Sequence, residues 1–441
     1  MKKSSLLLFM LCAAALTGVP AQVKTAPAAQ GKTAPAAQGK KKAKAPEIKI
    51  TCLPASHVAK IGEKVTFSVT SNSDLPAVVT VSLDGSAKKV FKSITSKAPV
   101  NVTVSLAYPG FLHCHVRSGK TVARAAVAVA PEKIRYSRKA PADFEKFWAD
   151  AFKESAKLPL DLKAEAVNPH KEYDTFLLSC ANVNGKRAYA FYTAPKNVKG
   201  KIPLMVYFGG GEAYISSSPF PSSAIRLARL FKRPMAVLYF HLPPYRPGTT
   251  WDEARTMHQK FLKELGLRRY ILVGMDSPKT FYAYSAILGC LRLLEHTANR
   301  PEIDKTKVLF KGASHGGKIG AYLAAFFPLK AAFLGVPSSC EINAHLEGRY
   351  GSAAREWVNY AKTSDYFDLV YFAPKIKCPV LVTLGHVDRS CPPTGVCSFY
   401  NAIPEGKKKL FAKLRHGHGD NPPGYDAMVW KFLTDQLTEK K

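Results

Sequence analysis

The stretch that decides the fold is 307–317, Lys-Val-Leu-Phe-Lys-Gly-Ala-Ser-His-Gly-Gly, in a chain of 441 residues. The apolar run 307–311 predicts a strand, and 318–327 predicts a helix directly after it. Between them Gly312, Ser314 and Gly316 form the G-x-S-x-G pattern of a nucleophile elbow, in which the helix N-terminus offers N–H donors to a developing oxyanion. A glycine-rich turn with a helix-capping serine would look the same, so partner residues must decide.

Outward from this stretch, residues 132–441 alternate short apolar runs with helix-like stretches. This alternation is typical of an α/β fold with a mainly parallel sheet. The helical apolar spacing in 281–299 predicts a helix before the elbow strand, and Asn184-Gly185 predicts a hairpin turn between two strands. The runs expected to form strands are 173–180, 187–192, 202–208, 235–240, 307–311, 331–336, 379–384 and 409–414.

A serine nucleophile needs a base and an orienting acid, which follow it in the order acid, then histidine, in α/β-hydrolases. Asp388 lies just past the run 379–384, and His418 lies just past the run 409–414. Because these loops lie at the carboxyl ends of parallel strands, we predict Ser314 as nucleophile, Asp388 as acid and His418 as base. The rival candidates are His416 and His386 as bases and Asp420 as a weaker acid.

An oxyanion hole needs two backbone N–H groups. One is expected from His315, the residue after the nucleophile. The other is expected from the glycine run 209–211 that follows the strand 202–208, where Gly210 is predicted and Gly211 stays the alternative. A plain flexible turn is the competing interpretation of this run.

Aromatic side chains could line a substrate pocket, although each would equally suit the core. Tyr214 and Tyr282 are the predicted substrate contacts, with Trp251 and Trp357 as further candidates. The six cysteines of the hydrolase-like part show no zinc spacing, so we predict no metal and no cofactor. Cys391 and Cys397 could pair within one loop.

Residues 47–131 predict a small all-β sandwich of the immunoglobulin-like kind. Three runs alternate apolar and polar residues, and turn signals separate them. Cys52 and Cys114 lie near an early and a late strand, and in an exported protein they could form a disulfide between the two sheets. The alternating apolar residues are Val65, Phe67 and Val69, then Val79, Val81 and Leu83, then Val102, Val104 and Leu106.

The sequence of residues 1–46 is typical of a targeting segment followed by a flexible tether. Basic residues precede a short apolar run over 6–16, which is too short to span a bilayer, so 1–21 is expected to be a signal peptide. The repeat KTAPAAQG at 24–31 and 32–39, followed by four lysines, predicts a flexible linker over 22–46. We therefore expect an exported protein, whose basic linker could contact an anionic cell surface.

Positive charge extends well beyond this tail. The formal net charge is +32, and residues 1–44 hold eight Lys and no acid, so the remainder still carries +24. Such an excess favours acidic partners or is a solvated basic surface. The chain shows no nucleic-acid-binding module, so nucleic acid is not an expected partner.

With these residues in place, 135–435 resembles the acetyl xylan esterase and cephalosporin-C deacetylase family of α/β-hydrolases (carbohydrate esterase family seven). Pro141-Ala142-Asp143-Phe144-Glu145-Lys146-Phe147-Trp148 is similar to that family's first helix. Asp388-Arg389-Ser390-Cys391-Pro392-Pro393-Thr394 is the most specific match. The resemblance implies that Ser314, Asp388 and His418 are the catalytic residues and that Gly209-Gly210 is the oxyanion turn.

The resemblance also implies a substrate class: a small acyl group, acetyl, on a sugar or xylo-oligosaccharide. It implies no metal or cofactor, and ring-like homo-oligomers occur in the family. Three departures affect the pocket: His315 replaces a usual Gln, Phe208 replaces a usual His, and 242–248 replaces an Arg-Gly-Gln-Gly segment. The alternatives are a peptidase or dienelactone-hydrolase-like enzyme of the same fold, and a glycan-binding surface protein with a degenerate hydrolase domain.

Overall fold

The computed structural model describes residues 47–72, 76–83, 89–94, 99–136, 138–211, 222–248, 250–349 and 359–438. The predicted signal peptide 1–21, the predicted linker 22–46, Tyr214 and Trp357 lie outside these ranges. Residues Glu47–Lys441 form one compact unit. Within the described residues, no helix is both long enough and apolar enough to cross a membrane.

A nine-stranded sheet forms the centre of the larger part, in the order β17-β16-β15-β14-β12-β13-β11-β10-β9. Neighbours from β13 to β17 run parallel, whereas β9, β10 and β11 add an antiparallel edge. The predicted mainly parallel α/β sheet is therefore confirmed. Its strands are β9 (Lys163–Ala166), β10 (Tyr173–Ala181), β11 (Arg187–Pro195), β12 (Ile202–Phe208), β13 (Ala236–His241), β14 (Ile303–Ala313), β15 (Ala331–Gly335), β16 (Val380–Gly385) and β17 (Lys408–Lys413).

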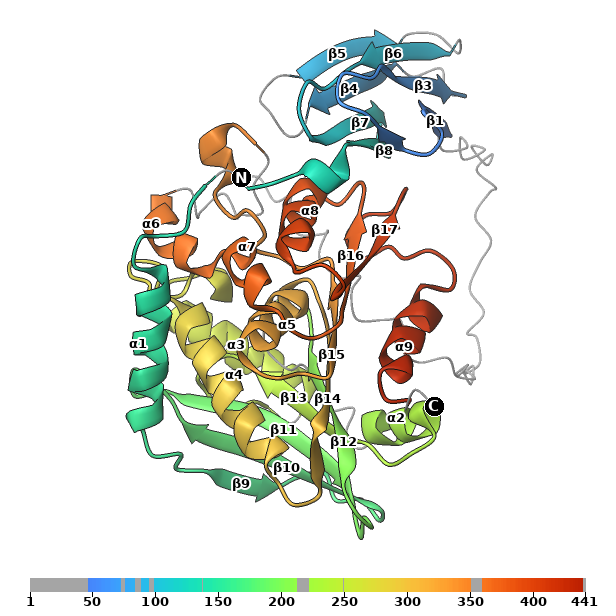
Figure 1. The fold of residues 1–441 in the computed structure, drawn as a ribbon. Helices are drawn as coiled ribbons and strands as arrows, with labels where there is room; N and C mark the ends of the chain where they lie inside the picture. The colour runs from blue at the N-terminus through green and yellow to red at the C-terminus, as the bar shows by residue number, and fades with distance from the viewer. Residues whose placement is uncertain are drawn as a thin grey trace, which may run out of the picture. The chain divides into compact units, whose positions relative to one another are not determined.

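Helices cover both faces of this sheet (Figure 1). One face packs against α1 (Phe144–Lys157), α4 (Tyr282–Ala298), α5 (His315–Phe326), α7 (Leu369–Phe372) and α8 (Pro393–Ala402). The other face packs against α2 (Ser222–Phe231) and α9 (Tyr425–Asp435). Burying both faces explains why the parallel strands are continuous apolar runs rather than alternating ones.

The remaining helices are short or peripheral. The helix α3 (Trp251–Glu264) begins at a capping box, in which the Thr250 hydroxyl accepts from the Glu253 N–H and the Glu253 carboxylate accepts from the Thr250 N–H. The others are α6 (Ala361–Ser364) and the 3-10 turns η1 (Pro131–Lys133), η2 (Tyr270–Leu272), η3 (Ala344–Glu347), η5 (Asp365–Phe367) and η6 (Ala373–Lys375).

The N-terminal part is an all-β sandwich of two sheets, with strand orders β1-β3-β6 and β2-β8-β7-β4-β5. Its inner positions alternate with outer ones, as the sequence predicts, and form a separate apolar core. The immunoglobulin-like classification stays a prediction. The strands are β1 (Ile48–Leu53), β2 (Val58–Ala59), β3 (Val65–Ser71), β4 (Ala77–Leu83), β5 (Lys89–Ile94), β6 (Val100–Val104), β7 (Gly110–Ser118) and β8 (Thr121–Val129).

The two disulfides that the sequence allows are not formed in this structure. Cys52 and Cys114 lie in the same sandwich core with free thiols, and Cys391 and Cys397 are also free. All four side chains are buried, so they act here as small apolar groups within well-packed interiors. The two pairings that the sequence left open are therefore not present in this structure.

The sandwich packs against the larger part through its five-stranded sheet. Phe111, Ala126 and Ala128 project from β7 and β8 into the apolar core that also contains α4 and α5. The Asn401 amide in α8 donates to the carbonyl oxygens of Pro131 (2.8 Å) and Ile134 (3.0 Å). The strand pair β7–β8 and the connecting segment are thereby fixed next to α8.

Candidate active site

Ser314 occupies the sharp turn between β14 and α5, with φ 57° and ψ −118°. A non-glycine residue at positive φ is strained, and such strain concentrates at functional turns. Close backbone packing surrounds the turn: a Cβ on Gly316 would lie 2.4 Å from the Phe208 carbonyl oxygen, and one on Gly312 would lie 2.6 Å from the Gly316 carbonyl oxygen. Both glycines of the motif are therefore required for the β12–β14–α5 contact, and Ser314 stays half-buried.

Three side chains predicted from the sequence form one hydrogen-bonded chain. Ser314 Oγ lies 2.9 Å from His418 Nε2, and His418 Nδ1 lies 2.8 Å from Asp388 Oδ2. The carboxylate can only accept, so Nδ1–H donates to Asp388 and leaves Nε2 free to accept the serine proton. The residues come from the carboxyl ends of β14, β16 and β17, which are neighbours through β15 in the sheet.

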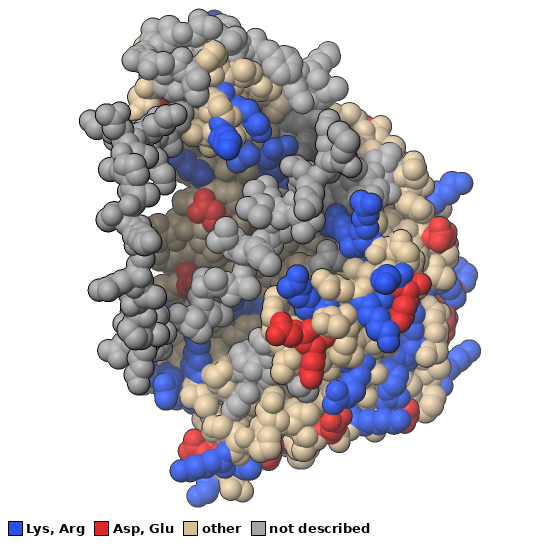
Figure 2. Space-filling model, turned by 180° about the vertical axis from the view of Figure 1, so that it is seen from behind, with Lys and Arg blue, Asp and Glu red and all other residues tan. Residues whose placement is uncertain are grey.

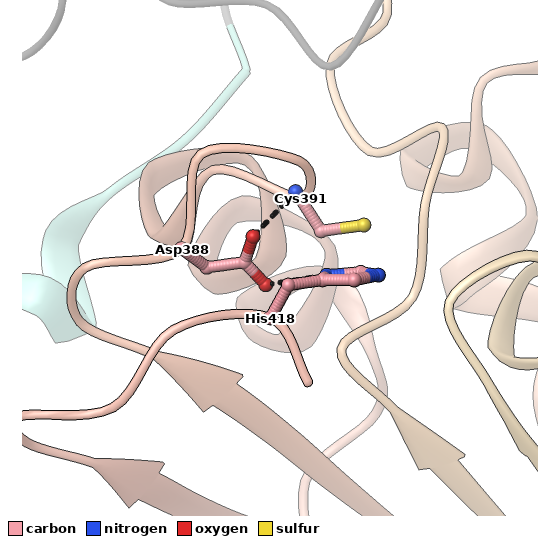
Figure 3. Close-up of side chains that lie close together, drawn as sticks. All are labelled: Asp388, Cys391 and His418. Carbon is pink, nitrogen blue, oxygen red and sulfur yellow. Dashed lines mark hydrogen bonds and ion pairs between the residues drawn. The ribbon is translucent and has the colours of Figure 1, made fainter. Parts of the chain in front are cut away.

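Asp388 is fixed by its own loop. Its side chain is fully buried, and Oδ1 accepts from the backbone N–H groups of Ser390 (2.8 Å) and Cys391 (2.9 Å). Figure 3 shows this carboxylate between the Cys391 N–H and the His418 ring. One oxygen is thus committed to the loop and the other to His418, which sets the orientation of the imidazole.

The loop that carries His418 is organised by a buried lysine at the end of β17. Lys413 Nζ donates to the carbonyl oxygens of Gly417 (3.0 Å) and Asp420 (2.9 Å) and to Asn421 Oδ1 (3.0 Å). Burial lowers the pKa of Lys413 below its usual value. The Lys413 ammonium therefore satisfies carbonyl oxygens of this loop and holds the turn around His418 together.

The glycine run after β12 lies beside the serine. A Cβ on Gly210 would lie 3.7 Å from Ser314 Cβ, and Gly211 has a φ of +79°. Gly210 is thus the glycine of this run that lies against Ser314, and its role as an oxyanion donor stays a prediction. His315 begins α5, so its backbone N–H belongs to the first turn of the helix, which has no intrahelical acceptor.

The side chain of His315 ties this glycine run to the interior. Nδ1 lies 3.0 Å from the Gly211 carbonyl oxygen, to which it must donate, and Nε2 lies 3.2 Å from the Tyr282 hydroxyl. The Lys318 ammonium in turn donates to that hydroxyl and lies 5.0 Å from the centre of the Tyr282 ring. The chain Gly211–His315–Tyr282–Lys318 therefore links the glycine run to α4 and α5.

Burial sets the protonation of this chain. It holds the pKa of His315 well below its usual value, with the Lys318 charge acting in the same direction. Burial also lowers the pKa of Lys318 to about 7. His315 is consequently neutral, with the proton on Nδ1, and Tyr282 donates to Nε2.

The structure separates the rival residues from Ser314. His416 pairs with Asp420 at 3.0 Å, and His386 packs edge-on against the Phe111 ring of the sandwich at 5.3 Å. Tyr282 is only 1% exposed, so the prediction that it contacts substrate is replaced by its role beneath His315. Trp251 is 43% exposed at the start of α3.

Among the described residues, one group of metal-ligand side chains lies together: Asp388, Cys391 and His418, with donor atoms within 4.8 Å of one another. Two of these side chains are already hydrogen-bonded to each other, as Figure 3 shows. The Cys391 thiol is buried, and burial holds its pKa well above the usual value, with the Asp388 charge adding to the effect. A protonated thiol is a poor metal ligand, so the donor set does not fit a resident ion.

Sequence reasoning missed three side chains around the site: Lys318, Cys391 and Lys413. Each is buried, and their positions offered signals: Lys318 lies one helical turn after Ser314, and Lys413 ends the strand β17 directly before the loop that carries His418. Cys391 Sγ lies within 4.8 Å of a carboxylate oxygen of Asp388 and of a ring nitrogen of His418. A charged residue at a predicted core position is the pattern that could have identified the two lysines.

Known proteins resemble this chain over the same region. Residues 131–436 match the family model described as acetyl xylan esterase. The acetyl esterase Axe7A of Xylanibacter ruminicola is 26% identical over 336 residues, which cover 73% of this chain and 74% of that protein. Two solved structures match with a TM-score of 0.56 and 20% identity. One is an acetyl xylan esterase from Paenibacillus sp. R4, and the match covers 69% of this chain and 98% of that protein. The other is acetyl xylan esterase 1 from Thermoanaerobacterium sp. JW/SL YS485, and the match covers 70% of this chain and 98% of that protein. These structures confirm the α/β-hydrolase fold.

Proposed function

The chain belongs to the acetyl xylan esterase family and is a carboxylic ester hydrolase, and we propose that it is a serine esterase that removes acetyl groups from acetylated sugars or xylo-oligosaccharides. The observation that supports this mechanism is the hydrogen-bonded chain Ser314–His418–Asp388, set at a strained elbow beside Gly210. The related Axe7A is described as an acetyl esterase, which supports acetyl as the acyl group.

In the proposed reaction, His418 Nε2 takes the proton from Ser314 Oγ as the oxygen attacks the ester carbonyl. The backbone N–H groups of His315 and Gly210 stabilise the oxyanion, and protonated His418 then donates to the departing sugar oxygen. Water, activated by His418, hydrolyses the acetyl-enzyme. Asp388 keeps the proton on Nδ1 and stabilises the imidazolium. We also propose export, because 1–21 has the pattern of a signal peptide.

The test compares Ser314→Ala with wild type on an aryl acetate and on acetylated xylo-oligosaccharides. We expect the variant to lose about a thousandfold or more in kcat, because the acyl-enzyme cannot form. Ser398→Ala is the matched control, since that hydroxyl is buried in α8 without a hydrogen-bond partner. Equal activity of Ser314→Ala and wild type would refute the proposed nucleophile.

A further inference from the structure

The five-stranded sheet of the sandwich reaches the loops that carry the candidate acid and base. His386, two residues before Asp388, packs against Phe111 at 5.3 Å and against the His57 ring at 6.4 Å. On the three-stranded sheet, burial raises the pKa of the Cys52 thiol in β1 to about 11, and Arg415, three residues before His418, lies close enough to act in the opposite direction. The sandwich therefore lies beside the active-site end of the larger sheet rather than at a distance from it.

The outer face of this sheet changes character along β7 and β8. At one end Phe111, Ala126 and Ala128 are covered by the hydrolase core. Further along, His115 pairs across the strands with Arg124, and Arg117 follows two positions after His115 on the same face. Arg117 and Arg124 are exposed. Neighbouring positions on one sheet face lie about 5–8 Å apart, so these long side chains can converge.

Arg389 adds a third guanidinium from the catalytic loop. It directly follows Asp388 and is exposed. Burial is the largest cause that lowers the pKa of Arg124 and of His115, and Arg389 lies close enough to both to lower each pKa further. We call this set of side chains the basic face. Its residues come from one sheet of the sandwich and from the loop that carries Asp388: His115, Arg117, Arg124 and Arg389.

The three guanidinium groups of the basic face are like charges without acidic partners among the described residues, whereas burial lowers the pKa of His115 and disfavours its charged form. Among the described residues, none of its four side chains forms an ion pair, whereas Arg138, Arg187 and Arg246 each pair with a carboxylate. Ten Lys and Arg stand against four Asp and Glu in 47–131. Figure 2 shows that Lys and Arg are also more abundant than Asp and Glu on the face it draws. Converging guanidinium groups repel one another unless an anion lies between them.

We propose that the basic face is a subsite for the carboxylate of an acidic acetylated glycan, held by Arg117, Arg124 and Arg389 while an acetyl ester of the same chain reaches Ser314. This inference rests on the proposed function, because it places the subsite next to Asp388. A guanidinium fork binds a carboxylate through two parallel hydrogen bonds, which suits a uronic-acid substituent. The sandwich would then select for acidic substrates, which accounts for the basic residues on this face.

The experiment compares two substrates that differ only in charge. One is an acetylated xylo-oligosaccharide with a glucuronic acid substituent, and the other is the same oligosaccharide with that carboxyl reduced to an alcohol. We expect wild type to favour the acidic substrate about tenfold in kcat/KM, mainly through KM, because a charge-assisted contact is worth that much. The preference should shrink in 0.5 M NaCl, which screens exposed charges.

The test variant is Arg117→Gln/Arg124→Gln, for which the expected ratio of the two kcat/KM values is near one. Lys153→Gln/Lys157→Gln on α1 removes the same charge from exposed residues outside the basic face and should keep the wild-type ratio. Two outcomes would overturn the proposed subsite. One is the same kcat/KM of wild type for both substrates, and the other is a ratio in the test variant that is unchanged from wild type.

Two further measurements separate this inference from the proposed function. Hydrolysis of an aryl acetate by wild type reports the esterase alone, since that ester carries no glycan. Calorimetric binding of the deacetylated acidic oligosaccharide to Ser314→Ala reports the subsite without catalysis. We expect binding that the reduced oligosaccharide does not show. Equal binding of both oligosaccharides, or binding of a short RNA with no binding of the acidic oligosaccharide, would contradict the proposal.

Discussion

His418 and His315 are both neighbours of Ser314, the first through a hydrogen bond and the second in the chain, yet they differ in burial and in their partners. The His418 side chain is 27% exposed and lies between a hydroxyl and a carboxylate, so it can gain and release a proton during a reaction. His315 is 4% exposed, and its neutral ring bridges a backbone carbonyl and a buried tyrosine. The difference shows that a position beside the nucleophile does not by itself define the role of a histidine. Its hydrogen-bond partners and its burial define that role.

The largest expected effect comes from removing His418, the partly exposed histidine of this pair. His418→Ala should lower kcat on an aryl acetate by about 10⁴-fold, because no base then accepts the serine proton. The control is His416→Ala, two residues away and paired with Asp420. Comparable losses in both variants would show that the loop, not the imidazole of His418, is what matters.

A smaller effect should follow from removing the buried histidine. His315→Ala releases the Gly211 carbonyl, and we expect kcat to fall by about 10- to 100-fold with little change in KM, because oxyanion contacts form in the transition state. His315→Gln should recover most of the loss, since an amide can donate to that carbonyl. A rise in KM with unchanged kcat would show that His315 does not position the oxyanion loop.

The smallest expected effect concerns stability. Burial holds the pKa of Lys318 at about 7 in the folded state, against 10.5 when exposed, so between these values the unfolded chain binds more protons. Wild-type stability relative to Lys318→Met should therefore rise with pH from 7 toward 10, by about 1.4 kcal/mol per pH unit at most.

Urea unfolding at pH 7, 8 and 9 measures this dependence. Lys153→Met, at an exposed position of α1, is the matched control and should follow wild type at each pH. A constant difference between wild type and Lys318→Met across the range would mean that Lys318 stays charged in the folded protein.

The same contrast explains what sequence could predict. The strands, the elbow and the order serine, acid, histidine follow from local patterns, and the structure brings Ser314, Asp388 and His418 together as expected. The roles of the His315 side chain and of Tyr282 could not be predicted, because they depend on contacts between β12, α4 and α5 that no local pattern encodes. Whether Cys52 and Cys114 bridge also stayed open in the sequence, because strand position does not determine whether two thiols pair, and both are free in the structure.

The central claim is that Ser314 is the nucleophile, and covalent trapping tests it most directly. The protein is treated with a fluorophosphonate, its intact mass is measured, and the labelled peptide is mapped. The account predicts one adduct, on the peptide containing Ser314, formed in step with loss of esterase activity and absent from Ser314→Ala. An adduct on another serine that parallels the loss of activity would contradict it.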